Sequence, residues 1–151
     1  MDTIAENKDV DTSFELFGKK FKYPIFAGPV GAVQLHYGDK YTEEEYNNIM
    51  LKSCNDSGIA YFTGDGVNPN VMIAATNMIK KQNGMGIPTV KPWNIDIIKE
   101  KMKLVADSNA FAVAMDIDGA GLPFLKNLTP KAGSKTVEEL REIKKLQIVL
   151  L

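Results

Sequence analysis

The chain has 151 residues, of which 44% are hydrophobic and 25% charged, and its formal net charge is −1. These proportions are typical of a soluble globular protein, and we expect residues 1–151 to form a single domain. The near-neutral charge argues against the broad basic surface that binds nucleic acid or anionic membranes. Because there is one cysteine, Cys54, the chain has no internal disulfide, which agrees with a reducing compartment.

No segment has the character of a membrane span or a secretory signal. The apolar runs are all shorter than the roughly 18 residues that a spanning helix needs. Residues 1–8 have neither a basic start nor an apolar block. The sequence therefore predicts no membrane association and a cytoplasmic location.

Short apolar runs with strand character alternate with longer segments of helical period. These runs are Pro24–Ala27, Ile59–Thr63, Gly86–Lys91 and Phe111–Asp116. Before them, Phe14–Phe21 has Gly18 near its centre and predicts a small hairpin. An alternation of strand and helix is typical of a parallel sheet with right-handed crossovers, and strands that are apolar on both faces fit a sheet covered on both sides.

The expected helices begin at residues that can cap free backbone N–H groups. Thr42–Glu45 and Thr136–Glu139 have the spacing of capping boxes, in which the threonine and glutamate side chains each accept one of these hydrogen bonds. Asn68 precedes Pro69, a residue well suited to the first turn of a helix, and Asn94 precedes another helical segment. Each of the first three expected helices therefore lies between two expected strands, as in a chain of strand–helix units.

This order of elements fits both an open doubly wound sheet and a (β/α)₈ barrel, and composition alone does not separate them. A complete barrel usually needs about 250 residues. We favour a partial TIM (β/α)₈ barrel made of about the first four βα units with parallel strands.

In such proteins the functional face lies at the carboxyl ends of the strands. Those ends are Ala27–Ala32, Thr63–Gly66, Thr89–Trp93 and Asp116–Gly121. Three of the four are glycine-rich, which suits close approach of backbone to a flat ligand, although glycines after strands are also common turn residues. The chain lacks the dinucleotide fingerprint and the phosphate loop, so a nucleotide site of the usual kind is not supported.

The charged candidates each have a plain alternative. Asp116 and Asp118, two apart on the expected strand, would share one face and perturb each other's ionisation or bind a cation; otherwise one caps a turn and the other is solvated. Lys91 would place a positive charge beside a ligand or extend to solvent. His36, the only histidine, is expected in an exposed loop, and we predict no metal site. Trp93 is expected to pack in the core or to line the mouth.

Four segments, in order along the chain, are similar to segments of one enzyme family. Pro24–Ala32 resembles a first-strand P-I-x-x-A-P-x-A motif, and Gly58–Asn70 a second-strand segment with a small polar residue at its end. Phe111–Asp118 resembles a fourth-strand run ending in T-V-D, and Thr136–Lys144 the helix that leads into the fifth strand. Together they resemble the FMN-dependent α-hydroxy-acid oxidases and dehydrogenases, the group of glycolate oxidase and lactate oxidase.

The resemblance implies a flavoprotein oxidoreductase that binds FMN and oxidises a small 2-hydroxy acid such as lactate or glycolate. By position it assigns cofactor contacts to Ala27, Gly28, Pro29, Val30, Gly31, Thr63, Gly64, Thr89, Lys91 and Asp116. Asp118 matches the family aspartate that supports the catalytic histidine. The chain departs from the family at Gly119–Phe124, which lacks the arginine of a substrate-carboxylate clamp, and at Pro88–Lys91, which replaces a glutamine and a tyrosine.

The family's fifth-strand lysine and histidine-glycine-glycine segment have no counterpart in these residues, so we expect an N-terminal half barrel, apparently truncated and inactive alone. Its open edges and apolar interior predict self-association or pairing with a complementary C-terminal half. Two alternatives remain: another FMN-barrel enzyme, such as a flavin-dependent isomerase or a nucleotide dehydrogenase, and a non-enzymatic half-barrel remnant.

Overall fold

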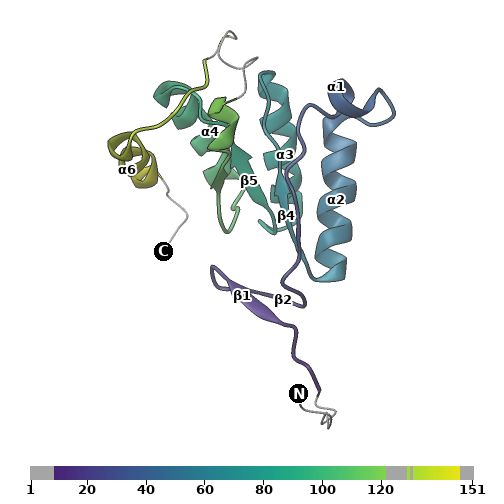
Figure 1. The fold of residues 1–151 in the computed structure, drawn as a ribbon. Helices are drawn as coiled ribbons and strands as arrows, with labels where there is room; N and C mark the ends of the chain where they lie inside the picture. Colours follow the sequence, from purple (N-terminus) through teal and green to yellow (C-terminus); the bar gives the residue numbers. More distant parts are fainter. Residues whose placement is uncertain (1–8, 122–128, 130, 147–151) are drawn as a thin grey trace, which may run out of the picture.

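The computed structural model describes residues 9–121, 129 and 131–146, and its centre is a sheet of four parallel strands (Figure 1). The strands are β3 (Phe26–Ala27), β4 (Ala60–Thr63), β5 (Ile87–Val90) and β6 (Ala114–Met115). Each lies within a run predicted from the sequence. Their order in space, β3-β4-β5-β6, equals their order in the chain. A doubly wound sheet reverses its strand order at a switch point, whereas consecutive order is what a barrel requires.

The two faces of the sheet carry different apolar clusters because successive side chains of a strand alternate. Tyr61 and Val90 point to the face covered by helices, where they pack with Leu51, Met72 and Ile98. The opposite face has its own cluster, which contains Ala60, Phe62, Ile87, Phe111 and Phe21. The sheet therefore has an outer face under helices and an inner face, as one side of a barrel does.

The main helices are α2 (Glu43–Ser57), α3 (Pro69–Lys81), α4 (Ile95–Asp107) and α6 (Val137–Lys145). Both predicted capping boxes are present, at the starts of α2 and α6. Asn68 and Asn94 cap α3 and α4 by accepting hydrogen bonds from Asn70 N and Ile97 N. The predicted helix starts are confirmed. Among the described residues, no helix combines the length and the apolar character of a membrane span.

The predicted N-terminal hairpin is also confirmed, as β1 (Phe14–Leu16) and β2 (Lys19–Phe21). It lies beneath the end of the sheet where the strands begin (Figure 1). The Phe14 ring stacks on Phe21 and meets Phe26 edge-on, both at 5.5 Å between centroids, and further ring contacts reach Phe62 and Phe111. This aromatic group closes the amino end of the sheet, so the carboxyl end is the open end.

Two local predictions are wrong. Strand β6 ends at Met115, and Asp118 begins a 3₁₀ helix, η1 (Asp118–Gly121), so Asp116 and Asp118 do not share a strand. The cause is local, since Asp116 Oδ1 accepts a hydrogen bond from Gly119 N at 3.1 Å and turns the chain. His36 lies in a short helix, α1 (Val33–Tyr37), where a loop was expected, although it is exposed as predicted.

Candidate functional site

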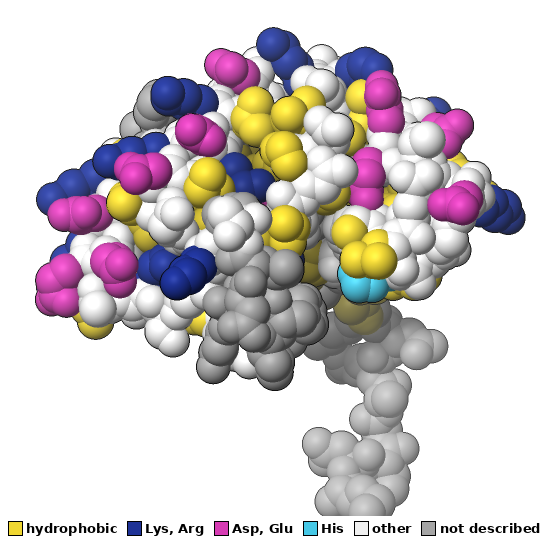
Figure 2. Space-filling view, turned by 90° about the horizontal axis from the view of Figure 1, so that it is seen from above, with side chains coloured by type: hydrophobic (Ala, Val, Ile, Leu, Met, Phe, Trp, Pro, Cys, Tyr) yellow, Lys and Arg dark blue, Asp and Glu magenta, His cyan; other side chains and the backbone are white. Residues whose placement is uncertain are grey.

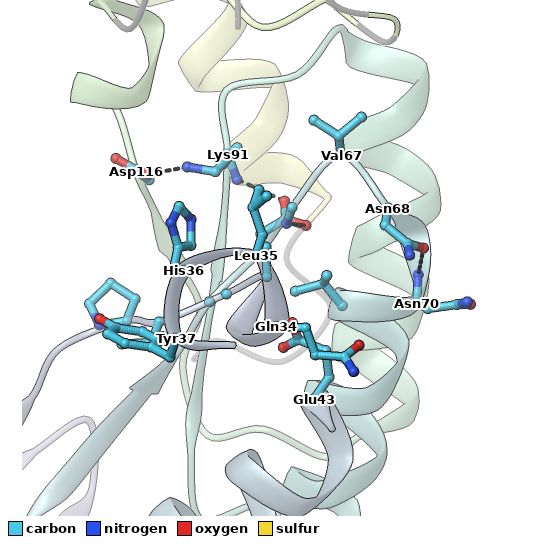
Figure 3. Close-up of a pocket in the computed structure, with 18 residues that line it drawn as sticks. Gln34, Leu35, His36, Tyr37, Glu43, Val67, Asn68, Asn70, Lys91 and Asp116 are labelled. Carbon is cyan, nitrogen blue, oxygen red and sulfur yellow. Dashed lines mark hydrogen bonds and ion pairs between the residues drawn. The ribbon is translucent and has the colours of Figure 1, made fainter. Parts of the chain in front are cut away.

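A pocket of about 1000 Å³ opens at the carboxyl end of the sheet (Figure 3). Its walls are the β3–α1 segment, the β4–α3 loop with the first turn of α3, the end of β5 and the residue that follows β6. Six of the predicted site residues line it: Pro29, Val30, Gly31, Gly64, Lys91 and Asp116. The expected convergence of strand ends at one rim is therefore present.

The other five predicted residues lie outside the pocket lining. Ala27 is half-buried in β3, and Thr63 is fully buried on the helix-covered face of β4, beside Tyr61 in the alternation of that strand. Gly28 and Asp118 are exposed next to the pocket. Thr89 is buried on β5, two residues before Lys91 and hence on the same face of the strand.

The structure gives Gly31 and Gly64 a different role from the one that the sequence suggested. A Cβ on Gly64 would lie 2.3 Å from the main chain of Val30 and Gly31, and a Cβ on Gly31 would lie 2.6 Å from the Asp65 carbonyl oxygen. Gly64 N also donates a hydrogen bond to Val30 O at 3.2 Å. These glycines let two loops pack main chain against main chain. Of the three predicted site glycines, Gly28 alone faces open space, because no atom lies within 4 Å of the position that a Cβ would take there.

A pair of opposite charges stands at the rim. Lys91 Nζ lies 2.9 Å from Asp116 Oδ2, and the two side chains are 19% and 26% exposed. Burial alone would raise the pKa of Asp116, but hydrogen bonds from Asp118 and Lys91 outweigh it and hold that pKa below its usual range. The hydrogen bond with Asp116 and its charge raise the pKa of Asp118. Lys91 therefore pairs with Asp116 and does not extend to solvent. Asp116 and Asp118 interact with each other, and Asp116 also accepts the hydrogen bond from Gly119 N that turns the chain.

Asp65 is the residue that the sequence analysis missed. It lines the pocket, yet its side chain is only 1% exposed and lies against Lys101 Nζ at 2.6 Å. The Trp93 indole N–H donates to the same carboxylate at 2.7 Å, so Trp93 is a buried packing residue with a polar contact. A signal existed: Lys101 falls within the apolar stripe of α4, between Ile98 and Met102, and a buried lysine needs an acidic partner.

Helix α1 forms the outer wall. Its N-cap residue, Ala32, has a left-handed backbone (φ 53°) and no capping side chain, and Glu43 of α2 instead accepts a hydrogen bond from Val33 N. Burial raises the pKa of Glu43. Leu35 and Tyr37 are 81% and 67% exposed. Figure 2 is a view onto the carboxyl end of the sheet and shows hydrophobic side chains next to the single histidine, His36.

No protein-family model matches the chain, and no curated protein matches it. Solved structures do match over 97–98% of the chain. A flavocytochrome b2 variant matches with a TM-score of 0.70 and 13% identity. A mandelate oxidase variant follows at 0.67 and 14%, and the monotopic membrane protein (S)-mandelate dehydrogenase at 0.57 and 10%.

The chain has the fold of a partial (β/α) barrel. It spans 39% of the flavocytochrome b2 chain, 46% of the mandelate oxidase chain and 37% of the mandelate dehydrogenase chain. The predicted fold class is confirmed, and the doubly wound alternative is excluded by the consecutive strand order. At these low identities the similarity establishes the fold alone, so the function has to be argued from the residues of the site.

Proposed function

We propose that the protein is an FMN-dependent oxidoreductase of 2-hydroxy acids, and that residues 1–151 form the part of its barrel that faces the flavin. The observation that carries the proposal is the pocket in which Pro29, Gly64, Lys91 and Asp116, from four different strand ends, meet at one rim. The sequence motifs and the fold point the same way. The similar structures include flavocytochrome b2, a second variant of which has pyruvate bound, and a mandelate oxidase; mandelate is a 2-hydroxy acid and pyruvate a 2-oxo acid.

The residues present fit a flat cofactor with a polar edge. The open space beside Gly28 leaves room for a ring against the main chain of the β3–α1 segment. The Thr63 and Thr89 hydroxyls are both buried without a hydrogen-bond partner among the described residues. Thr89 shares a face of β5 with Lys91, so its hydroxyl is the one of the two that a ligand atom beside the pocket would satisfy. The Thr63 hydroxyl points to the helix face, so Gly64 is the better candidate of the two for a contact with the ring's edge.

Each rim residue then has a definite task. The main chain of Gly28 to Gly31 would hold the ring, and Lys91, the one lysine or arginine among the described pocket-lining residues, would place a positive charge beside it. Asp118 would support a histidine base, as the family resemblance implies. FMN, when bound, accepts the hydride equivalents of the substrate. We propose small acids such as lactate and glycolate as substrates.

The open side of the sheet supports a proposal about partners. Within the described residues, β3 and β6 each pair with a strand on one side only. Ile25 and Phe26 at one edge and Ile117 at the other are 56%, 43% and 55% exposed. Unpaired edges beside apolar side chains favour association, so we propose that a second copy or a complementary half of the barrel covers them. Sedimentation that shows a monomer at all concentrations, with no added partner, would argue against self-association.

The function is tested by titrating the 151-residue protein with FMN and following the quenching of flavin fluorescence. Because these residues form only part of a barrel, we expect weak but saturable one-to-one binding. It should weaken further in Lys91→Met and be unchanged in Asp56→Asn, a variant remote from the pocket. Absence of saturable binding by a folded protein would refute the proposal. Because the single histidine, His36, is not part of a histidine-glycine-glycine segment, we expect bound FMN to resist bleaching by lactate, glycolate or mandelate.

A further inference from the structure

The Asp65 carboxylate receives four hydrogen bonds at the floor of the pocket, and the proposed function assigns it no task. Oδ2 accepts from Lys91 N at 3.0 Å and from Trp93 Nε1 at 2.7 Å. Oδ1 accepts from Gly66 N at 2.8 Å and from Lys101 Nζ at 2.6 Å. Each oxygen thus accepts two hydrogen bonds, and the four donors are Gly66, Lys91, Trp93 and Lys101.

The charge of Asp65 is balanced beneath the pocket. Lys101 lies on α4 and is 7% exposed, and its ammonium also stands 5.6 Å from the centre of the Trp93 ring. A buried carboxylate without such a partner would be strongly disfavoured. Because Lys101 neutralises the carboxylate, Asp65 can stay charged in this buried position and accept the hydrogen bonds from Gly66 N and Lys91 N.

The contacts of Asp65 join the loops that form the rim. The main chain of Asp65 packs against Gly31 of the β3–α1 segment, while its side chain binds the main chain of Lys91 at the end of β5. One residue earlier, Val90 O accepts a hydrogen bond from Asp116 N at 2.9 Å and connects β5 to the residue after β6. The backbone that carries Lys91 is therefore held from both sides.

We propose that Asp65 is a positioning residue, which fixes the main chain at the end of β5 so that the Lys91 ammonium stays against the Asp116 carboxylate at the pocket. The hydrogen bond from Lys91 N to the Asp65 carboxylate fixes the backbone of Lys91. The Lys91 ammonium then lies 2.9 Å from Asp116 Oδ2. The inference rests on the proposed function only for the identity of the ligand that Lys91 meets.

The test is the pH titration of the Asp116 carboxyl carbon by NMR, in the wild type and in Asp65→Asn. Lys91 and Asp118 are the charged groups that hydrogen-bond to Asp116, so its titration reports where the Lys91 ammonium lies. If Asp65 positions Lys91, the Asp116 midpoint moves up toward that of an unpaired aspartate, and FMN binds at least tenfold more weakly. Asp56→Asn, which breaks the exposed Lys52–Asp56 ion pair, is the matched control and changes neither quantity.

A purely stabilising role would lower stability and leave the Asp116 titration of the folded protein as it is, so an unchanged midpoint in folded Asp65→Asn overturns the proposal. If that variant does not fold, Asp65→Asn with Lys101→Met removes the unpaired ammonium as well, and the same shift is expected. No shift in the double variant would also overturn it. Failure of the wild type to bind FMN would refute the proposed function, while the carboxyl titration would still decide the role of Asp65.

Discussion

Replacing Gly64 with alanine should push apart the β3–α1 and β4–α3 segments, which line the pocket. The new Cβ would lie 2.3 Å from Gly31 N and from the Val30 carbonyl carbon, whereas real Cβ contacts are essentially never below 3.0 Å. The β3–α1 and β4–α3 segments must therefore part by at least 0.7 Å, the difference between these distances. The hydrogen bond from Gly64 N to Val30 O, already 3.2 Å long, would be lost.

The expected cost of Gly64→Ala combines two effects. Overpacking costs about 1–3 kcal/mol, and the lost hydrogen bond adds about 1 kcal/mol. The sum, about 2–4 kcal/mol, is a large part of the ~5–15 kcal/mol that stabilises a typical domain. Urea denaturation, followed by circular dichroism and by the fluorescence of Trp93, the only tryptophan, measures it.

Gly28→Ala is the matched control, because nothing lies within 4 Å of its Cβ position. We expect its free energy of unfolding to stay within about 0.5 kcal/mol of the wild type. Its FMN affinity should fall, since the methyl group would occupy the space proposed for the ring. Equal stability of the wild type and Gly64→Ala would refute the packing argument, and unchanged FMN affinity in Gly28→Ala would refute the position given to the ring.

Three further variants test single features of the fold. Ala32→Gly should raise the free energy of unfolding by about 1 kcal/mol in urea denaturation, because a left-handed backbone costs alanine more than glycine; a loss would contradict this. Burial raises the pKa of Glu43 above 4.5, so its contribution to stability is present at low pH and is lost as pH rises through the raised pKa. Glu43→Gln should therefore gain stability at neutral pH, by less than about 1 kcal/mol because the group is partly exposed, and thermal melting should show no gain at a pH well below 4.5. Thr136→Ala removes the hydroxyl oxygen that accepts a hydrogen bond from Glu139 N and should cost about 1 kcal/mol; an unchanged urea midpoint would show that the cap contributes nothing.

The sequence predicts those features whose causes are local. The capping boxes at Thr42 and Thr136 formed because the partners stand three residues apart and meet in any helix that begins there. The four strands were found because each run is apolar on both faces and is bounded by turn residues. The convergence of Pro29, Gly64 and Lys91 then follows from parallel strands alone, since their carboxyl ends meet at one edge.

The features that were missed depend on contacts between distant segments. Asp65 meets Lys101 across 36 positions, and nothing near Asp65 in the sequence indicates that a lysine of α4 will neutralise it. Helix α1 has no capping side chain of its own and depends on Glu43, ten residues after Val33. Asp118 lies outside the expected strand because the Asp116 side chain accepts a hydrogen bond from Gly119 N and turns the chain. The alternation of residues along a strand does not indicate this hydrogen bond.

The most direct test of the central claim is to map FMN onto the protein by the amide NMR signals that it moves. We predict that the signals of Gly28, Gly31, Gly64 and Lys91 shift together and saturate, while those of the hairpin at the opposite end of the sheet, such as Gly18, stay in place. Shifts confined to the hairpin end, with the rim signals unmoved, would contradict the account.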